Sequence, residues 1–136
     1  MNQHGHFVWT EFVTRDPERF KTFYAQTIGW AYEAQNQPDG TCYWLIFENG
    51  ARVGGIFPTN RPGFENVPDS WMPYLAVDDV DARVEKAIAA GAQLMKPIFE
   101  VPHVGRMAIL MQPGGVGVGW ITPAACSQAE KSAPEV

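Results

Sequence analysis

Residues 4–12, "HGHFVWTEF", place two histidines and a glutamate within one short segment of β-type composition. Imidazole nitrogens and carboxylate oxygens are the ligands that zinc, iron and nickel sites use. On a strand, however, His4 and His6 point to the face opposite Glu11, because successive side chains alternate. Unless a bulge intervenes, the segment predicts terminal, solvent-exposed histidines and no native metal site.

A second group with chemical potential is His103 and Arg106, in "VPHVGRMAIL" just before and within a β-type run. Arginine offers a two-pronged fork to a carboxylate or carbonyl, and neutral imidazole can act as a base or acid. The pair indicates either a contact with an anionic or carbonyl substrate, or a surface turn.

The composition narrows the partners. The 136 residues include 10 Lys and Arg against 15 Asp and Glu, a net charge of −5. No basic run is present, which argues against nucleic acid and against an anionic membrane surface. Cys42 and Cys126 lie far apart without metal-binding spacing, and no signal segment or long apolar run occurs, so we expect a cytoplasmic protein.

The first half reads as strand, helix and further strands. A strand over 6–14 stops before Asp16 and Pro17, which suit a helix N-terminus, and the helix should end at Gly29. Its expected apolar positions are Phe20, Phe23, Tyr24 and Ile28. Strands over 41–48 and 51–57 flank Asn49-Gly50, which is typical of a two-residue hairpin turn, and 58–70 reads as a connector.

The second half repeats this plan. A strand over 71–77 precedes Asp78 or Asp79 as helix cap, and strands are expected over 92–100, 106–112 and 116–122. The apolar positions of this helix are Val80, Val84, Ala87 and Ile88, and Gly91 ends it. Asp16 aligns with Asp79 at an offset of 63 residues, which indicates two βαβββ modules at about 5–58 and 70–124, with a polar tail over 125–136.

Four segments carry a resemblance: "FVWTEFVTRDPERFKTFYAQTIGW", "RVGGIFP", "YLAVDDVDARVEKAIAAGA" and "VPHVGRMAILMQPGGVGVGW". Together they resemble the vicinal oxygen chelate superfamily, which includes glyoxalase I, extradiol dioxygenases and the bleomycin and fosfomycin resistance proteins. The resemblance implies an α+β fold in which paired βαβββ modules form a curled mixed sheet, a half-barrel cleft, with helices outside. It also implies a small-molecule ligand in that cleft and a homodimer as a common assembly.

In metal-binding members of the superfamily, the ion is held by His or Glu on the first and last strands of the modules. By resemblance, the first-strand positions fall here on Trp9 and Met72. The last-strand positions fall on Gly54 or Gly55 and on Gly119. None of these residues offers an oxygen or imidazole ligand, so we expect no metal and no cofactor.

If Trp9 faces inward, as the resemblance implies, Phe7, Glu11 and Val13 share its face and Phe12 points toward the helix. An inward acid is costly unless it is hydrated or paired, so Glu11 marks either a ligand-binding carboxylate or a salt bridge to Arg52 or Arg106. The equivalent of Glu11 in the second module is Tyr74.

These residues leave several functions open. The first is a metal-free binder of a small, partly apolar molecule, with Trp9, Trp44, Met72, Arg106 and Trp120 as ligand-binding candidates. The second is a metal-independent isomerase or lyase with Glu11 as base and Tyr74, His103 or Arg106 polarising a carbonyl. An atypical metal-dependent glyoxalase or dioxygenase and a non-catalytic interaction domain are the remaining alternatives.

Overall fold

The computed structural model describes residues 3–38, 40–101 and 104–124, which form two compact units. One unit comprises residues 9–71, and the other comprises residues 3–8 together with 72–124 of the described chain. The proposed tail over 125–136 lies outside the described residues.

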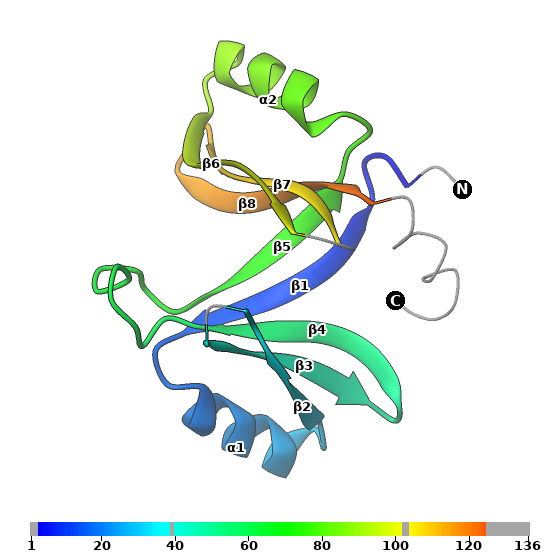
Figure 1. Ribbon diagram of the computed structural model, residues 1–136, viewed down its shortest axis with the longest axis vertical. Helices are drawn as coiled ribbons and strands as arrows, with labels where there is room; N and C mark the ends of the chain where they lie inside the picture. The colour runs from blue at the N-terminus through cyan, green and yellow to red at the C-terminus, as the bar shows by residue number, and fades with distance from the viewer. Residues whose placement is uncertain (1–2, 39, 102–103, 125–136) are drawn as a thin grey trace. The chain divides into compact units, whose positions relative to one another are not determined.

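The first unit is one βαβββ module whose strands form a mixed sheet in the order β2-β3-β4-β1 (Figure 1). Strands β1 and β4 run parallel, and the β2–β3 and β3–β4 pairs are antiparallel. Its elements are β1 (Phe7–Thr14), α1 (Pro17–Thr27), β2 (Ala31–Asn36), β3 (Cys42–Glu48) and β4 (Ala51–Pro58).

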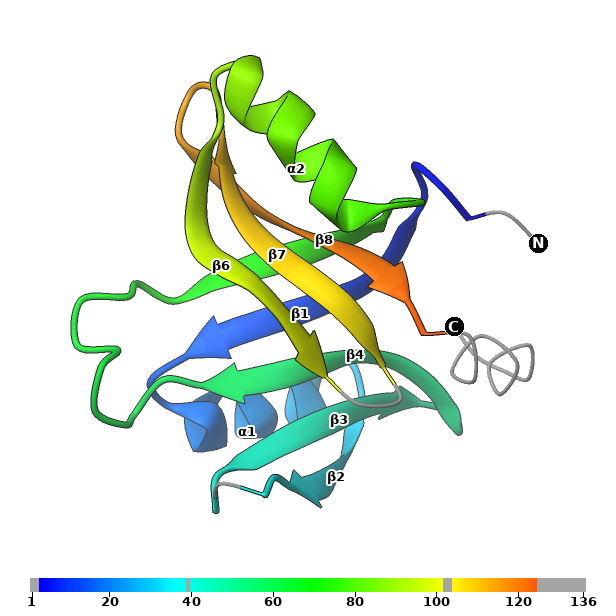
Figure 2. The same cartoon turned by 45° about the horizontal axis from the view of Figure 1, so that its top comes forward.

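The second unit repeats this topology with the strand order β5-β8-β7-β6 (Figure 2). Here β5 and β8 are the parallel pair, equivalent to β1 and β4. Its elements are β5 (Ser70–Ala76), α2 (Val80–Ala89), β6 (Gln93–Val101), β7 (Gly105–Gln112) and β8 (Val116–Pro123). The predicted α+β class and the two βαβββ modules are therefore confirmed.

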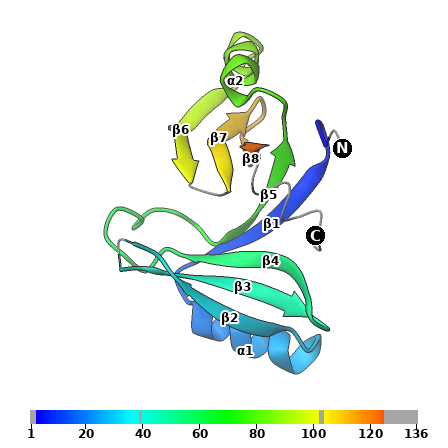
Figure 3. The ribbon, with the colours of Figure 1, turned by 45° about the vertical axis from the view of Figure 1, so that its right-hand side comes forward.

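Helix α1 covers one face of its sheet (Figure 3). Aromatic side chains pack between the helix and the sheet. Phe20 is buried against Ile46 and Ile56, and the rings of Phe12 and Phe20 stack at 4.3 Å between centroids. The helix begins at Asp16, whose side chain accepts a hydrogen bond from the Arg19 N–H, as the Asp-Pro pair predicts. The prediction that Phe12 points toward the helix is thereby confirmed.

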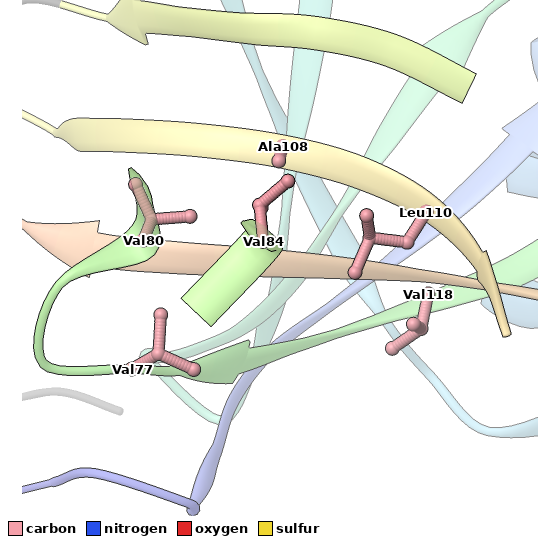
Figure 4. Packing of buried hydrophobic residues seen from close by; sticks show 6 residues of the cluster. All are labelled: Val77, Val80, Val84, Ala108, Leu110 and Val118. Carbon is pink, nitrogen blue, oxygen red and sulfur yellow. The ribbon is translucent and has the colours of Figure 1, made fainter. Parts of the chain in front are cut away.

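Helix α2 packs on a cluster of buried aliphatic residues (Figure 4). Val84 from the helix lies among strand residues such as Ala108 and Leu110, which are 0% and 1% exposed. Of the two acids offered as its cap, Asp79 is the N-cap and accepts from the Ala82 N–H, whereas Asp78 binds Arg83. The buried cluster consists of Val77, Val80, Val84, Ala108, Leu110 and Val118.

The hairpin turn at Asn49-Gly50 is present as predicted, since both residues have positive φ, 53° and 83°. Strand β2 was not located from the sequence, because five of its six residues are exposed and only Tyr32 packs against the core. A solvent-facing edge strand carries no alternating apolar signal.

Some predicted apolar helix positions are wrong. Phe23 and Ile28 are each 54% exposed, and Ile88 on α2 is 49% exposed. The helices are short and each packs on a single sheet face, so only a narrow stripe is buried while the flanking apolar residues remain in solvent. No helix within the described residues is both long and apolar enough to cross a membrane.

Candidate functional site

The sheet of the first unit has a face that turns away from α1, and Trp9 and Glu11 lie on it. Glu11 is paired in register with Gly55 of the neighbouring strand β4, and Gly55 is paired with Leu45 of β3. Because Phe12 packs on α1 and side chains alternate, Glu11 points to the opposite side of the sheet. Trp9 and Glu11 are both half-buried there.

Tyr43 joins this face and reaches across Gly55. Its hydroxyl oxygen accepts a hydrogen bond from the Trp9 indole N–H, with 3.0 Å between Nε1 and Oη. A Cβ atom added at Gly55 would overlap the Tyr43 hydroxyl and lie 2.6 Å from its Cε2 atom. The two aromatic side chains therefore meet above Gly55, and only glycine leaves room for that contact.

Tyr43 was not selected from the sequence as a site residue. It lies two residues before Leu45 on β3, so strand alternation places it on the Glu11 face once the β3–β4 register is known. The signal that could have found it is the glycine pair at 54–55, since a glycine in a strand marks a close approach by another group.

The second unit shows the same arrangement with different residues. Tyr74 is paired in register with Gly119, and a Cβ at Gly119 would overlap the Tyr74 ring, with 2.9 Å to its Cζ atom. The Met72 methyl carbon lies 3.6 Å from the position of a Cβ at Gly117. Met72 and Tyr74 thus lie together on the face opposite α2.

The registers also settle which glycine is equivalent to Gly119. Gly55 faces Glu11 as Gly119 faces Tyr74, so Gly55 rather than Gly54 occupies the last-strand position of the first module. At both glycines, the volume nearest the backbone is filled by a tyrosine. The donor set of Trp9, Met72, Gly55 and Gly119 does not fit a divalent metal, and the described residues contain no cluster of three or more His, Cys, Asp or Glu suited to one.

His4 is used for a structural contact in the second unit. Its Nδ1 atom accepts a hydrogen bond of 3.0 Å from the Asp78 N–H, at the turn before α2. Beside it, the Ala76 N–H donates to the His6 carbonyl and the Gly5 N–H donates to the Ala76 carbonyl. His4 therefore contacts the turn before α2, and both His4 and His6 are exposed.

Arg106 lies on the α2 side of its sheet and is occupied by carboxylates. It donates to both oxygens of Asp81, at 2.7 and 3.0 Å, and its Nη1 lies 3.5 Å from Glu100. This contact lowers the pKa of Asp81 and raises that of Arg106, in each case chiefly through the hydrogen bond. Arg106 therefore pairs with Asp81 and Glu100 instead of Glu11, and Arg52 forms no ion pair within the described chain.

Two further tryptophans proposed as ligand-binding residues lie on the helix sides of the sheets. Trp44 packs against the α1 core, and the Lys21 ammonium nitrogen lies 3.2 Å from its ring centroid. Trp120 packs against the α2 core. Trp44 is thus not brought together with Glu11, nor Trp120 with Tyr74, because strand parity sends them to opposite faces. His103 lies outside the described residues.

A separate hollow of about 310 Å³ lies in the first unit, beside the beginning of α1. Of the predicted ligand-binding residues, it involves only Trp44. Its lining consists of Pro17, Thr41, Cys42, Trp44, Pro58, Asn60 and Arg61.

Comparison with known protein families identifies the class of protein to which this fold belongs. Residues 9–116 match the family model described as "Glyoxalase-like domain", and the chain belongs to that family. The predicted membership of the vicinal oxygen chelate superfamily is thereby confirmed.

Among its relatives is a Mycobacterium tuberculosis protein named "Putative glyoxylase CFP32", 38% identical over 112 residues. The match covers 82% of this chain but only 43% of that relative, so the chain spans less than half of the relative's length.

Solved structures share the fold at low identity. A Streptomyces coelicolor methylmalonyl-CoA epimerase, solved with 2-nitronate-propionyl-CoA, superposes with a TM-score of 0.63 at 15% identity, covering 91% of this chain and all (100%) of that one. A Mn(II)-bound glyoxalase from Novosphingobium aromaticivorans gives a TM-score of 0.58 at 18% identity, covering 90% of this chain and 40% of that one.

Proposed function

We propose that this chain is a glyoxalase-like protein that works without the family's divalent metal and binds a small, partly apolar molecule on a sheet face that turns away from its helix. The observation that carries the proposal is the tyrosine lying over each of Gly55 and Gly119. A side chain able to ligate a metal from either position would first have to displace that tyrosine. Protein side chains, rather than a bound metal, would therefore make the contacts with a ligand on these faces.

The side chains of the second unit support a partly apolar ligand. Besides Met72, the face opposite α2 carries Ile109, in register with Gly119, and Met111, in register with Gly117, and all three are half-buried. Methionine adapts its shape to irregular apolar surfaces, so this face suits a ligand with an aliphatic or aromatic portion.

Two measurements test the proposal. Plasma mass spectrometry of untagged protein, after dialysis against zinc, iron, manganese and nickel, should find metal far below one equivalent. A thermal-shift screen against small neutral aromatic and aliphatic molecules should find ligands that raise the melting temperature, because binding to the folded state stabilises it. Stoichiometric metal retained through dialysis, or no ligand in a broad screen, would contradict it.

A second candidate is acid–base catalysis, favoured by the position of Glu11 on the same face as the Tyr43 phenol. A carboxylate on a half-buried sheet face is a candidate base for proton abstraction. Glu11→Gln should then abolish turnover of a responsive substrate while leaving the unfolding transition unchanged. Turnover that survives this substitution would exclude Glu11 as the base.

The proposal also includes a cellular compartment and an oligomeric state. We place its activity in the cytoplasm, because Cys42 and Cys126 show no disulfide or metal-binding spacing. Pairing of two copies as a homodimer, as the superfamily resemblance implies, would be measured by sedimentation equilibrium of the full chain.

A further inference from the structure

The hollow beside the beginning of α1 lies on the helix side of the first sheet. Along β3, Cys42 and Trp44 share a face with Ile46, which is buried in the cluster under α1. Along β4, Pro58 shares a face with Ile56 of the same cluster. The hollow is therefore formed by the beginning of β3, the end of β4 and the first turn of α1, all within the first unit.

Of the described residues that line this hollow, only Arg61 is charged. Its Nε–H donates to the Pro58 carbonyl oxygen, with 3.0 Å between the two atoms. Its guanidinium carbon lies 4.6 Å from the ring centroid of Phe57 and 5.6 Å from that of Phe64. One backbone hydrogen bond and two aromatic rings thus hold the guanidinium at the rim of the hollow.

These contacts leave the charge of Arg61 uncompensated within the described chain. No carboxylate of the described residues pairs with it, and its two Nη groups donate no hydrogen bond there. The neighbouring cation differs, because the Lys21 ammonium lies 3.0 Å from a Glu18 carboxylate oxygen as well as over the Trp44 ring. The hollow therefore presents one oriented, unpaired guanidinium beside the apolar surfaces of Pro17, Trp44 and Pro58.

We propose that this hollow is a second ligand site, separate from the sheet face of the proposed function, and that it binds a small monocarboxylate with a flat, apolar remainder. The two Nη groups of Arg61 donate to the two carboxylate oxygens, since the planar fork of arginine matches that geometry. The apolar part packs on Trp44 and Pro17. A single cation favours a monoanion over a doubly charged phosphate, and a volume of about 310 Å³ suits a small ligand.

Two probes of the same shape test this site in the wild-type protein. Benzoate and benzamide both carry a phenyl ring, but only benzoate is charged. In NMR titrations of the full-length chain, benzoate should bind at least about tenfold more tightly, the size expected for hydrogen bonds between charged groups. The amide shifts that benzoate changes should concentrate at residues 41–44 and 58–61, together with the Trp44 indole N–H.

Substitutions then separate Arg61 from the general charge of the protein. Arg61→Gln should remove the preference for benzoate and leave benzamide binding unchanged. Arg52→Gln is the matched control, because it removes the same charge from an exposed residue near the opposite end of β4. Arg61→Lys keeps the charge without the planar fork and should recover only part of the preference.

Several results would overturn the proposal: no binding of benzoate, equal affinity for benzamide, shift changes elsewhere in the chain, or equal losses in Arg61→Gln and Arg52→Gln. The comparison of the two probes uses the wild type alone, so it decides the matter even if Arg61→Gln does not fold, which circular dichroism would reveal. The proposed function stands or fails separately, on the metal content and on the screen of neutral molecules.

Discussion

The contact above Gly55 predicts a strong energetic coupling between Gly55 and Tyr43. Gly55→Ala adds a methyl group where the Tyr43 hydroxyl and ring edge lie, so the tyrosine must swing aside. It then loses its hydrogen bond to Trp9, about 1 kcal/mol, and the overpacking itself costs about 1–3 kcal/mol. Replacing glycine within a strand returns about 0.5–1 kcal/mol, which leaves a net destabilisation of about 2 kcal/mol.

In a Tyr43→Ala background the obstruction is absent, and Gly55→Ala should be neutral or slightly stabilising. The double-mutant cycle therefore predicts a coupling of about 2 kcal/mol between the two sites. Free energies of unfolding come from urea titrations followed by circular dichroism and tryptophan fluorescence, with coincident transitions as the check on two-state behaviour.

Gly54 supplies the matched control. A Cβ at Gly54 would lie 2.6 Å from the Thr10 carbonyl oxygen on β1, which is backbone and unaffected by Tyr43. Gly54→Ala should therefore destabilise both backgrounds equally, within about 0.5 kcal/mol. If Gly55→Ala proves additive with Tyr43→Ala, or if Gly54→Ala shows the same coupling, the account of the Gly55 position is refuted.

Three further predictions follow from other contacts. The pKa of Asp81 is lowered by its pair with Arg106, so this pair stabilises the fold above the unfolded-state pKa of about 4, and the stabilisation is lost as the pH falls below that value. The free energies of unfolding of Asp81→Asn and wild type, from urea titrations, should therefore differ at pH 7 and converge in acid. Asp16→Ala removes the cap of α1 and should cost about 1 kcal/mol by thermal denaturation, a value near zero contradicting the capping role. Val84→Ala, at a 3% exposed site, should cost about 2 kcal/mol, whereas Ile88→Ala on the same helix, 49% exposed, should stay within about 0.5 kcal/mol in urea titrations.

The backbone plan was readable from the sequence because local signals agreed at each boundary. Asp16 and Asp79 both cap helices, and the hairpin at Asn49-Gly50 requires the positive φ that these residues tolerate. Strand β2 was not predicted, because a polar edge strand has no periodic apolar signal. The buried face of each helix was predicted to be wider than it is. Periodicity shows which residues lie on one side of a helix, but it does not show how many of them the sheet buries.

The site could be predicted only in part. Face assignment from alternation was correct for Phe12, and it placed Glu11 on the opposite side. Arg106 and Trp120, proposed as ligand-binding residues, lie on the α2 side of their sheet, and their strand parity could be assigned only once the β7–β8 register was known. Tyr43 was missed for a similar reason, since its contact with Trp9 spans three strands and depends on which glycine of the 54–55 pair lies beneath it.

In the two modules, the tyrosine that fills the space above the equivalent glycine comes from different strands, and the consequence of this difference can be measured. In the first, the tyrosine above the glycine comes from β3, whereas in the second it comes from β5, at the position equivalent to Glu11. The register equivalent of Tyr43 in the second module is Met107, opposite Ile121. If each glycine is required by its own tyrosine, Gly119→Ala should couple with Tyr74→Ala by about 2 kcal/mol and be nearly additive with Met107→Ala. Coupling of equal size between Gly119 and Met107 would contradict this. It would mean that both glycines are required for a backbone property shared by the two modules, such as strand bending, and that the tyrosines merely occupy the space that the glycines leave.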